Sequence, residues 1–377
     1  MTDAGQTVAL CMIVKNERPV LERCLQSVLP WIDHWTVVDT GSNDGTQELV
    51  RACLGSKPGQ LVERPWQNFG WNRTEAVGLA RASADYLLTL DADEYLLTEP
   101  GFRWPTLQHD AYTFQVDSGG VLYARTQLVR SSLPWRYQGV LHEYITCDGP
   151  HTEQRMQGVM TIRLPEGARA RDPLTYQRDV DVLELALRDD PGNRRHLFYL
   201  AQSHRDAHQH APALRRYRER AAAGGFPEEI WCSLYEAAKL MCVLGEDWTV
   251  VQEAFLDAYR YRPSRAEPLY RIGVFYSNEG HYEEALRYLE HALQIPQPAT
   301  ESLFVEADVY RFLLPLEYAV VCSWLGRHTE AIALTDRLLG TDGLTAERKA
   351  LLLRNRQFSV SSVSSVQQSQ EQLSGGE

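Results

Sequence analysis

In the first part of the chain, stretches with the apolar spacing of a strand alternate with stretches that have the apolar spacing of a helix. Short apolar runs rich in β-branched residues predict buried strands, and they lie at residues 7–14, 36–39 and 86–90. Longer amphipathic stretches predict helices, at residues 19–29, 46–53 and 72–84. This alternation predicts a mainly parallel sheet covered by helices on both faces. Two further runs predict antiparallel strands around Ser118-Gly-Gly120, at residues 111–116 and 121–130.

From about residue 176 the pattern becomes helical and repeats itself. The small and aromatic positions of a tetratricopeptide unit recur with starts 34 and then 38 residues apart, at Leu197, Trp231 and Leu269. One such helix pair cannot bury its apolar face alone, so the units are expected to stack into an array. The predicted organisation is an α/β domain, a linker or lid, an all-α repeat domain and a disordered Ser/Gln/Gly-rich tail, at 1–146, 147–175, 176–356 and 357–377.

Two acidic loops each follow a predicted strand. The first is Asp39-Thr-Gly-Ser-Asn-Asp-Gly-Thr46 and the second is Leu90-Asp-Ala-Asp-Glu94. Ligands of open α/β sheets bind at the carboxyl ends of the strands, so both loops should converge on one crevice. Asp91 and Asp93 flank one small residue, and together with substrate phosphates they suit one hard divalent cation. The loops therefore predict a site for a metal-bridged nucleoside diphosphate.

The same residues carry a resemblance to a known family. Cys11-Met-Ile-Val-Lys-Asn-Glu17, the segment from Val37 to Thr46 and Leu90-Asp-Ala-Asp-Glu94 resemble family 2 glycosyltransferases of the GT-A fold, over roughly residues 7–146. That fold is Rossmann-like, with a mostly parallel mixed sheet. Trp135-Arg-Tyr-Gln-Gly-Val-Leu-His-Glu143 and the helical second half resemble the branch with tetratricopeptide repeats, similar to sublancin-type peptide S-glycosyltransferases. A related branch, which Trp66-Gln-Asn-Phe-Gly-Trp-Asn-Arg73 also resembles, glycosylates lipopolysaccharide core.

The resemblance implies an inverting enzyme that needs Mn²⁺ or Mg²⁺ and a nucleotide-sugar donor, with a UDP-sugar favoured. It makes Asp93 the metal ligand, while Asp91 either contacts the ribose or binds the metal through water. The donor-binding positions it implies are Val14, Asn16, Glu17, Asp39, Gly41, Asp44, Arg73 and Asp91. Two of these have a plain structural alternative. Asp44 suits an Asp-Gly turn, and Arg73 suits a surface salt bridge as well as a phosphate.

Inverting transfer needs one base to deprotonate the acceptor. The resemblance places a carboxylate near the end of the GT-A domain, which makes Glu143 the base and His142 a metal ligand or a donor-phosphate contact. The family usually has an acidic pair there, further from the metal motif, so the two roles could be exchanged. Trp71, Trp135 and Tyr137 either stack on sugar or base or pack in the core.

Composition and charge restrict the expected partners and the expected location of the protein. The chain has 377 residues and a net charge of −12, which offers no polybasic field for nucleic acid. A locally basic stretch, residues 150–220, holds thirteen Arg against ten Asp and Glu. Seven scattered cysteines without metal spacing, no signal peptide and no run of eighteen apolar residues predict a cytoplasmic protein without a membrane span.

The sequence leaves three classes of acceptor open. The family branch and the repeats favour a protein or peptide side chain, a glycan comes next, and a modified DNA base rests only on the basic stretch. The repeat domain also suits homo-oligomer formation. Two competing classes are a catalytically dead nucleotide-sugar-binding scaffold, against which the intact Asp91 and Asp93 argue, and a nucleotidyltransferase. The latter normally has a Gly-rich loop after the first strand, where this chain has Lys15-Asn-Glu-Arg18.

Overall fold

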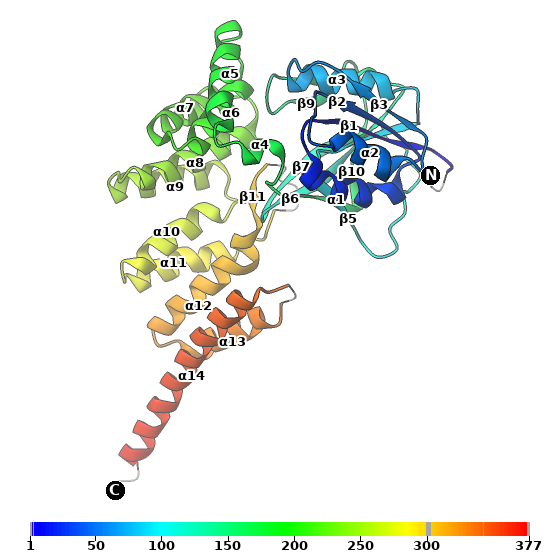
Figure 1. Ribbon diagram of the computed structural model, residues 1–377. Helices are drawn as coiled ribbons and strands as arrows, with labels where there is room; N and C mark the ends of the chain where they lie inside the picture. The colour runs from blue at the N-terminus through cyan, green and yellow to red at the C-terminus, as the bar shows by residue number, and fades with distance from the viewer. Residues whose placement is uncertain (1, 3, 299–302, 342, 375–377) are drawn as a thin grey trace. The chain divides into compact units, whose positions relative to one another are not determined.

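The computed structural model describes residues 2, 4–298, 303–341 and 343–374, and the chain divides into two compact units (Figure 1). Unit 1 comprises Met1–Ile230 with Ser302–Phe304, and unit 2 comprises Trp231–Glu301 with Val305–Glu377. Unit 1 therefore contains the sheet and also the first helices after residue 175.

One mixed sheet organises unit 1, with strand order β3-β2-β1-β4-β7-β6-β10-β5. Its strands are β1 (Val8–Val14), β2 (His34–Asp39), β3 (Gly59–Glu63), β4 (Tyr86–Thr89), β5 (Glu94–Thr98), β6 (Ala111–Ser118), β7 (Val121–Arg130) and β10 (Glu153–Arg163). The first four strands in this order are parallel, and β7 runs antiparallel to both β4 and β6. Strand β10 runs parallel to β6 and antiparallel to β5. A separate hairpin pairs β8 (Trp135–Gln138) with β9 (Tyr144–Cys147).

Helices cover both faces of this sheet because successive side chains of a strand point to opposite sides. Leu10 and Met12 of β1 share a buried cluster with Leu21, whereas Cys11 shares another with Val77. Leu21 belongs to α1 and Val77 to α3, which lie on the two faces in Figure 1. The helical elements here are α1 (Arg18–Val28), η1 (Leu29–Trp31), α2 (Thr46–Leu54), α3 (Phe69–Ala80) and α4 (Ala168–Arg171).

The rest of the chain is almost entirely helical. Its elements are α5 (Thr175–Asp189), α6 (Arg194–Asp206), α7 (His210–Ala222), α8 (Pro227–Val243), α9 (Trp248–Tyr261), α10 (Glu267–Asn278), α11 (Tyr282–Leu293), β11 (Val305–Glu306), the π-helix η2 (Val309–Leu313), α12 (Leu314–Trp324), α13 (His328–Leu339) and α14 (Ala346–Ser374). Consecutive helices pack as pairs within each unit, α6 with α7, α10 with α11 and α12 with α13. This is the tetratricopeptide-like arrangement that the repeat predicts. None of the described helices is both long enough and apolar enough to cross a bilayer.

Two segments differ from the expectation drawn from the sequence. Residues 147–175 are not a plain linker or lid, because they contain β10, which lies between β5 and β6 in the sheet. Its buried positions Met156, Val159 and Thr161 are unevenly spaced, with Gly158 between the first two, so the sequence does not show the alternation of a strand. The tail was expected to be disordered, yet α14 continues through Ser374, since no Gly or Pro interrupts it. Residues 375–377 lie outside the described residues.

The pairing of α10 with α11 depends on a glycine. A Cβ added at Gly273 would lie 2.6 Å from Cδ2 of Leu289, so the side chain of α11 occupies the space that any larger residue would need. We predict that Gly273→Ala separates the two helices and destabilises the pair by about 1–3 kcal/mol. Hydrogen exchange should speed up at the backbone amides of α10 and α11 while the amides of the sheet keep their protection.

Gly78→Ala is the matched control, because Gly78 also lies inside a helix but a Cβ there meets nothing within 4 Å. Removing a helical glycine without a clash stabilises by about 0.5–1 kcal/mol. Equal exchange rates in the Gly273→Ala variant and the wild type would contradict the packing role.

Candidate active site

The loops that follow β1 and β2 are tied to one another by side-chain hydrogen bonds. Asn16 adopts the left-handed conformation, with φ of 55°, and its side chain accepts a hydrogen bond from the Asn43 backbone N–H at 2.9 Å. The Asn16 backbone N–H in turn donates to Ser42 Oγ at 2.9 Å. Val14 ends β1, and its carbonyl accepts from the Thr40 backbone N–H at 3.0 Å. The two loops therefore form one rigid edge at the carboxyl ends of their strands.

Asp39 lies at the centre of this edge and is fully buried. Its Oδ1 accepts hydrogen bonds from the backbone N–H groups of Gly41 and Ser42, at 2.9 and 2.8 Å. Gly41 has φ of 102°, a conformation that glycine adopts without strain. The other oxygen, Oδ2, has no hydrogen-bond partner among the described residues. A buried carboxylate oxygen without a donor is costly, so this atom suits a hydroxyl or N–H of a ligand.

Asp44 has a local structural role. Its Oδ1 accepts from the backbone N–H of Thr46 at 3.0 Å and from the Thr46 hydroxyl at 2.6 Å, at the start of α2. Its Oδ2 accepts from the Arg18 backbone N–H at 3.2 Å. Asp44 therefore makes the turn that the Asp-Gly sequence favours, and both of its oxygens already have donors.

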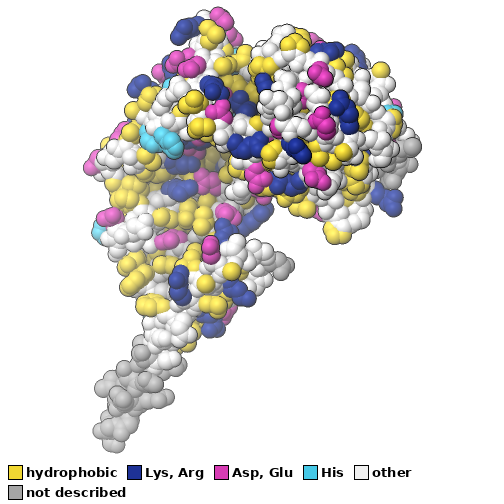
Figure 2. Space-filling model, viewed as in Figure 1, with side chains coloured by type: hydrophobic (Ala, Val, Ile, Leu, Met, Phe, Trp, Pro, Cys, Tyr) yellow, Lys and Arg dark blue, Asp and Glu magenta, His cyan; other side chains and the backbone are white. Residues whose placement is uncertain are grey.

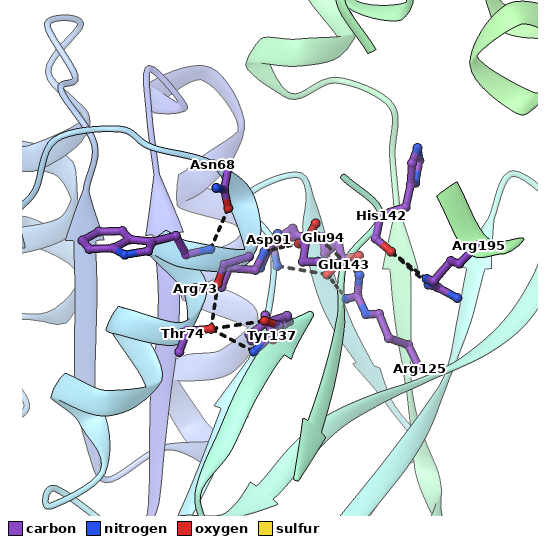
Figure 3. A network of polar contacts seen from close by, with 12 residues as sticks. Asn68, Arg73, Thr74, Asp91, Glu94, Arg125, Tyr137, His142, Glu143 and Arg195 are labelled. Atoms are coloured by element: carbon purple, nitrogen blue, oxygen red, sulfur yellow. Dashed lines mark hydrogen bonds and ion pairs between the residues drawn. The ribbon is translucent and has the colours of Figure 1, made fainter. Parts of the chain in front are cut away.

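An ion network joins the second acidic loop to the segment that contains Glu143 (Figure 3). The Arg73 guanidinium binds Asp91 Oδ1 through Nη2, and its Nε lies 2.5 Å from Glu143 Oε1. Arg125 of β7 lies 3.4 Å from Asp91 Oδ2 and 2.5 Å from Glu94 Oε2. Arg73 therefore does not make a plain surface salt bridge, since its side chain is 15% exposed and holds two candidate site carboxylates together.

Neighbouring cations neutralise the carboxylates of this region to different degrees. Burial alone would raise the pKa of Asp91, but Arg73 and Arg125 overcome it and hold that pKa well below its usual range. Asp93 differs, because burial and the neighbouring Asp91 raise its pKa to about 6. Burial likewise raises the pKa of Glu17 to about 7, although the Ala168 backbone N–H opposes this. Negative charge is thus left uncompensated beside Asp93.

This charge distribution bears on where a divalent cation would fit. The carboxylate of Asp93 has a distant ion pair, 3.8 Å from Arg163 Nε, whereas Asp91 is occupied by two arginines. Within the described ranges, no three His, Cys, Asp or Glu side chains gather into a preformed metal cluster. A cation would therefore fit at Asp93 only if a ligand such as a diphosphate completed its coordination.

The segment after β10 packs directly on this acidic edge. The Leu164 backbone N–H donates to the Asp93 carbonyl at 3.1 Å, and a Cβ at Gly167 would lie 3.3 Å from Asp93 Cβ. The Ala168 backbone N–H donates to Glu17 Oε2 at 2.9 Å. Residues 164–171 therefore cover the carboxylates of two loops at once.

His142 and Glu143 point in different directions. Figure 3 shows the His142 ring directed away from the network that contains Glu143. The ring stacks on Tyr199 of α6, with centroids 4.0 Å apart, and Arg195 Nη2 donates to the His142 carbonyl at 2.9 Å. The ring keeps exposed surface, yet the surrounding protein removes water from it and, with Arg169 and Arg195, lowers its pKa. An imidazole stacked on Tyr199 is not aimed at the Asp91 loop.

Comparisons with known proteins agree with this arrangement. Residues 9–99 match the family described as Glycosyl transferase family 2. The chain carries a glycosyltransferase family 2 domain. A TPR repeat-containing protein of Synechococcus elongatus is 37% identical over 150 residues, which are 37% of this chain and 35% of that protein. An uncharacterised glycosyltransferase of Rickettsia bellii is 33% identical over 92 residues, 24% of this chain and 29% of that protein. The chain thus spans about a third of the length of the curated relatives it matches.

Solved structures resemble the helical part. MamA has 15% identity and a TM-score of 0.35, over 44% of this chain and 87% of its own. A thermophilic TPR protein of Thermus thermophilus has 19% identity and a TM-score of 0.34, over 48% of this chain and 90% of its own.

The ion network contains two charged residues that sequence reasoning missed, Glu94 inside the matched region and Arg125 of β7 beyond it. Glu94 stands inside the quoted acidic motif but was given no role, and its buried carboxylate accepts the Asp91 backbone N–H at 3.0 Å. Arg125 gave a weak signal, as one charged residue in the middle of a strand. Among the candidate aromatic residues, Trp135 is 5% exposed and packs in the core, whereas Trp71 is 40% exposed.

We predict that Arg73→Met destabilises unit 1 by about 3 kcal/mol, because it leaves the partly buried Glu143 without its cation and Asp91 with Arg125 alone. Arg64→Met is the control, since the Arg64–Glu75 pair is 35% and 23% exposed and should contribute about 1 kcal/mol at most. Hydrogen exchange at β4 and α3 amides in mild urea measures both. Equal effects of the two substitutions would refute the anchoring role of Arg73.

Proposed function

We propose that the protein is an inverting, metal-dependent glycosyltransferase that moves a sugar from a nucleotide-sugar donor to an acceptor. The observation that carries this proposal is the Arg73 bridge, which brings Asp91 of the acidic motif and Glu143 to the same guanidinium. Two carboxylates of separate roles are thereby held within one site, as a donor-binding group and a base must be. The family 2 domain supports glycosyl transfer in general.

The donor nucleotide would bind along the edge formed by the first two loops. Asp39 Oδ2 is the buried atom without a partner there, so it would accept a hydrogen bond from the ribose or the base. Asp93, together with Asp91 directly or through water, would hold Mn²⁺ or Mg²⁺ with the diphosphate. The cation, when bound, neutralises negative charge on the departing diphosphate. A UDP-sugar is the donor favoured by the family resemblance.

Glu143 would serve as the base. Its carboxylate is 9% exposed, and Arg73 fixes one of its oxygens at 2.5 Å. Such an anchor orients the side chain while the acceptor hydroxyl gives up its proton to the carboxylate. His142 stacks on Tyr199 and faces elsewhere, which favours a supporting role for it over that of base or metal ligand.

A nucleic-acid acceptor is the weakest of the three acceptor classes. At least seven of the thirteen arginines in residues 150–220 pair with carboxylates, among them Arg169 with Asp179 and Arg220 with Glu229. On the face of unit 1 in Figure 2, basic and acidic side chains are interspersed. A surface that binds phosphates needs unpaired cations in a row.

The metal role is tested by Asp93→Asn. We expect this variant to lose Mn²⁺-dependent binding of UDP in calorimetry and to lose hydrolysis of UDP-sugars, because the amide removes the charge that the cation needs. Chelation should reproduce the loss in the wild type, and added Mn²⁺ should restore it. The matched control is Glu166→Gln. Glu166 lies in the segment 164–171 that covers the acidic edge, and its exposed carboxylate pairs with Arg23 of α1. Wild-type turnover that persists in chelator would disprove the metal assignment.

The base is tested by Glu143→Gln, which keeps the shape of the side chain. Removing a general base lowers turnover by about 10²- to 10⁴-fold, and UDP affinity should stay the same because the base does not touch the nucleotide. His142→Ala should change turnover less than Glu143→Gln. Steady-state kinetics with UDP-sugar hydrolysis measure both. If His142→Ala abolishes turnover and Glu143→Gln preserves it, the two roles must be exchanged.

A further inference from the structure

A cavity of about 680 Å³ lies within unit 1 and is not used by the proposed donor chemistry. Its walls come from the start of α3, the β8–β9 hairpin and the start of α6. Cavities of this size suit small molecules of a few rings rather than an extended chain.

The cavity shares a wall with the proposed catalytic network. Tyr137 lines it, and the Arg73 guanidinium carbon lies 5.6 Å from the centre of the Tyr137 ring. Gly139 lines it as well, and a Cβ added there would lie 3.4 Å from Glu143 Cα. A molecule held in the cavity would therefore lie against Tyr137 and against the backbone that carries Glu143, although the Glu143 side chain does not itself line the cavity.

Two aromatic side chains of the lining are exposed. Trp71 is 40% exposed and Tyr144 is 41% exposed, and the Arg195 guanidinium carbon lies 4.8 Å from the centre of the Tyr144 ring. Trp71 belongs to α3 and Tyr144 to β9, so they come from separate walls. Flat apolar rings at the edge of a polar cavity suit the C–H face of a sugar.

Three buried polar atoms of lining residues have no hydrogen-bond partner among the described residues. They are Glu75 Oε2, Arg136 Nη1 and His196 Nδ1. His196 is 9% exposed as a residue. The first atom only accepts, the second only donates, and the imidazole nitrogen does either according to its tautomer. Hydroxyl groups both donate and accept, so a polyhydroxylated ligand matches this mixed set better than an apolar or a singly charged one.

We propose that this cavity binds a saccharide, the sugar ring of the acceptor, so that the enzyme extends a glycan rather than modifying a polypeptide. The proposal rests on the proposed function for the reaction that follows binding. In that reaction the acceptor hydroxyl oxygen forms a bond to the anomeric carbon of the donor while the bond from that carbon to the diphosphate oxygen breaks. The hydroxyl proton goes to Glu143, and the nucleoside diphosphate leaves with the electron pair.

The test compares purified wild-type protein on an array of defined oligosaccharides and on an array of unstructured peptides. We expect selective binding to oligosaccharides with a shared terminal sugar. Calorimetry with the best oligosaccharide should show that Trp71→Ala weakens binding by about tenfold or more, as loss of a central aromatic contact does. Trp71→Phe should recover part of the affinity, which separates stacking from misfolding.

Trp66→Ala is the matched control, because Trp66 is 41% exposed on the same segment but does not line the cavity. It should bind the oligosaccharide as the wild type does. A cavity that instead holds the sugar of the donor would make Trp71→Ala weaken UDP-sugar binding and leave UDP binding intact. That result overturns the acceptor assignment.

Binding to peptides but not to oligosaccharides, or to neither array, also overturns the proposal. So does equal oligosaccharide affinity for Trp71→Ala and the wild type. A different measurement tests the proposed glycosyl transfer. That proposal is wrong if the wild-type protein neither binds UDP in the presence of Mn²⁺ nor hydrolyses UDP-sugars. A protein that binds saccharides but shows neither of these two activities would be a carbohydrate-binding protein, and this result would refute only the proposed transferase activity.

Discussion

The site depends on one guanidinium. Arg73 binds Asp91 through Nη2 and lies with Nε 2.5 Å from Glu143 Oε1, although these carboxylates come from the end of β4 and from the turn before β9. Three charges with little exposure are tolerated only when each has its partner. The position of Arg73 is fixed by α3, whose first turn is capped by Asn68, which accepts the Trp71 backbone N–H at 2.8 Å. The start of one helix thus sets the separation of two functional carboxylates.

The second constraint is an imbalance of charge. Asp91 is compensated by two arginines, whereas burial and the neighbouring acids raise the pKa values of Asp93 and Glu17. Residues 164–171 cover this edge with the Ala168 backbone N–H, which donates to Glu17, and with Arg171, which lowers the pKa of Glu17, and a Cβ at Gly167 would lie 3.3 Å from Asp93 Cβ. This acidic edge is where the proposed cation and diphosphate would bind, and the described residues hold no preformed group of three metal ligands there.

The sequence predicted those features that depend on the spacing of apolar residues and on short local motifs. Strands β1, β2 and β4, the helices on both faces and the helical repeats follow from apolar spacing, and the acidic loops follow from strand ends, whereas β3, β5 and the β8–β9 hairpin were not predicted. It did not predict β10, because Gly158 and a register shift between Arg155 and Met160 break its alternation, nor the start of α3 at Phe69, which follows the Asn68 cap. Arg125 reaches Asp91 only because β7 pairs antiparallel with β4, a register that no local signal encodes.

The least predictable feature is the turn that presents Glu143. His142 has φ of 49°, a left-handed conformation that is unfavourable for a residue with a Cβ. Arg195 of α6 holds this turn through the His142 carbonyl, and Tyr199 holds it through the stacked ring. Neighbouring residues joined by such a turn face different directions, so Glu143 reaches Arg73 because His142 turns toward α6. The first helical pair after the sheet therefore supports the site directly. Both contacting residues lie in α6, which belongs to unit 1.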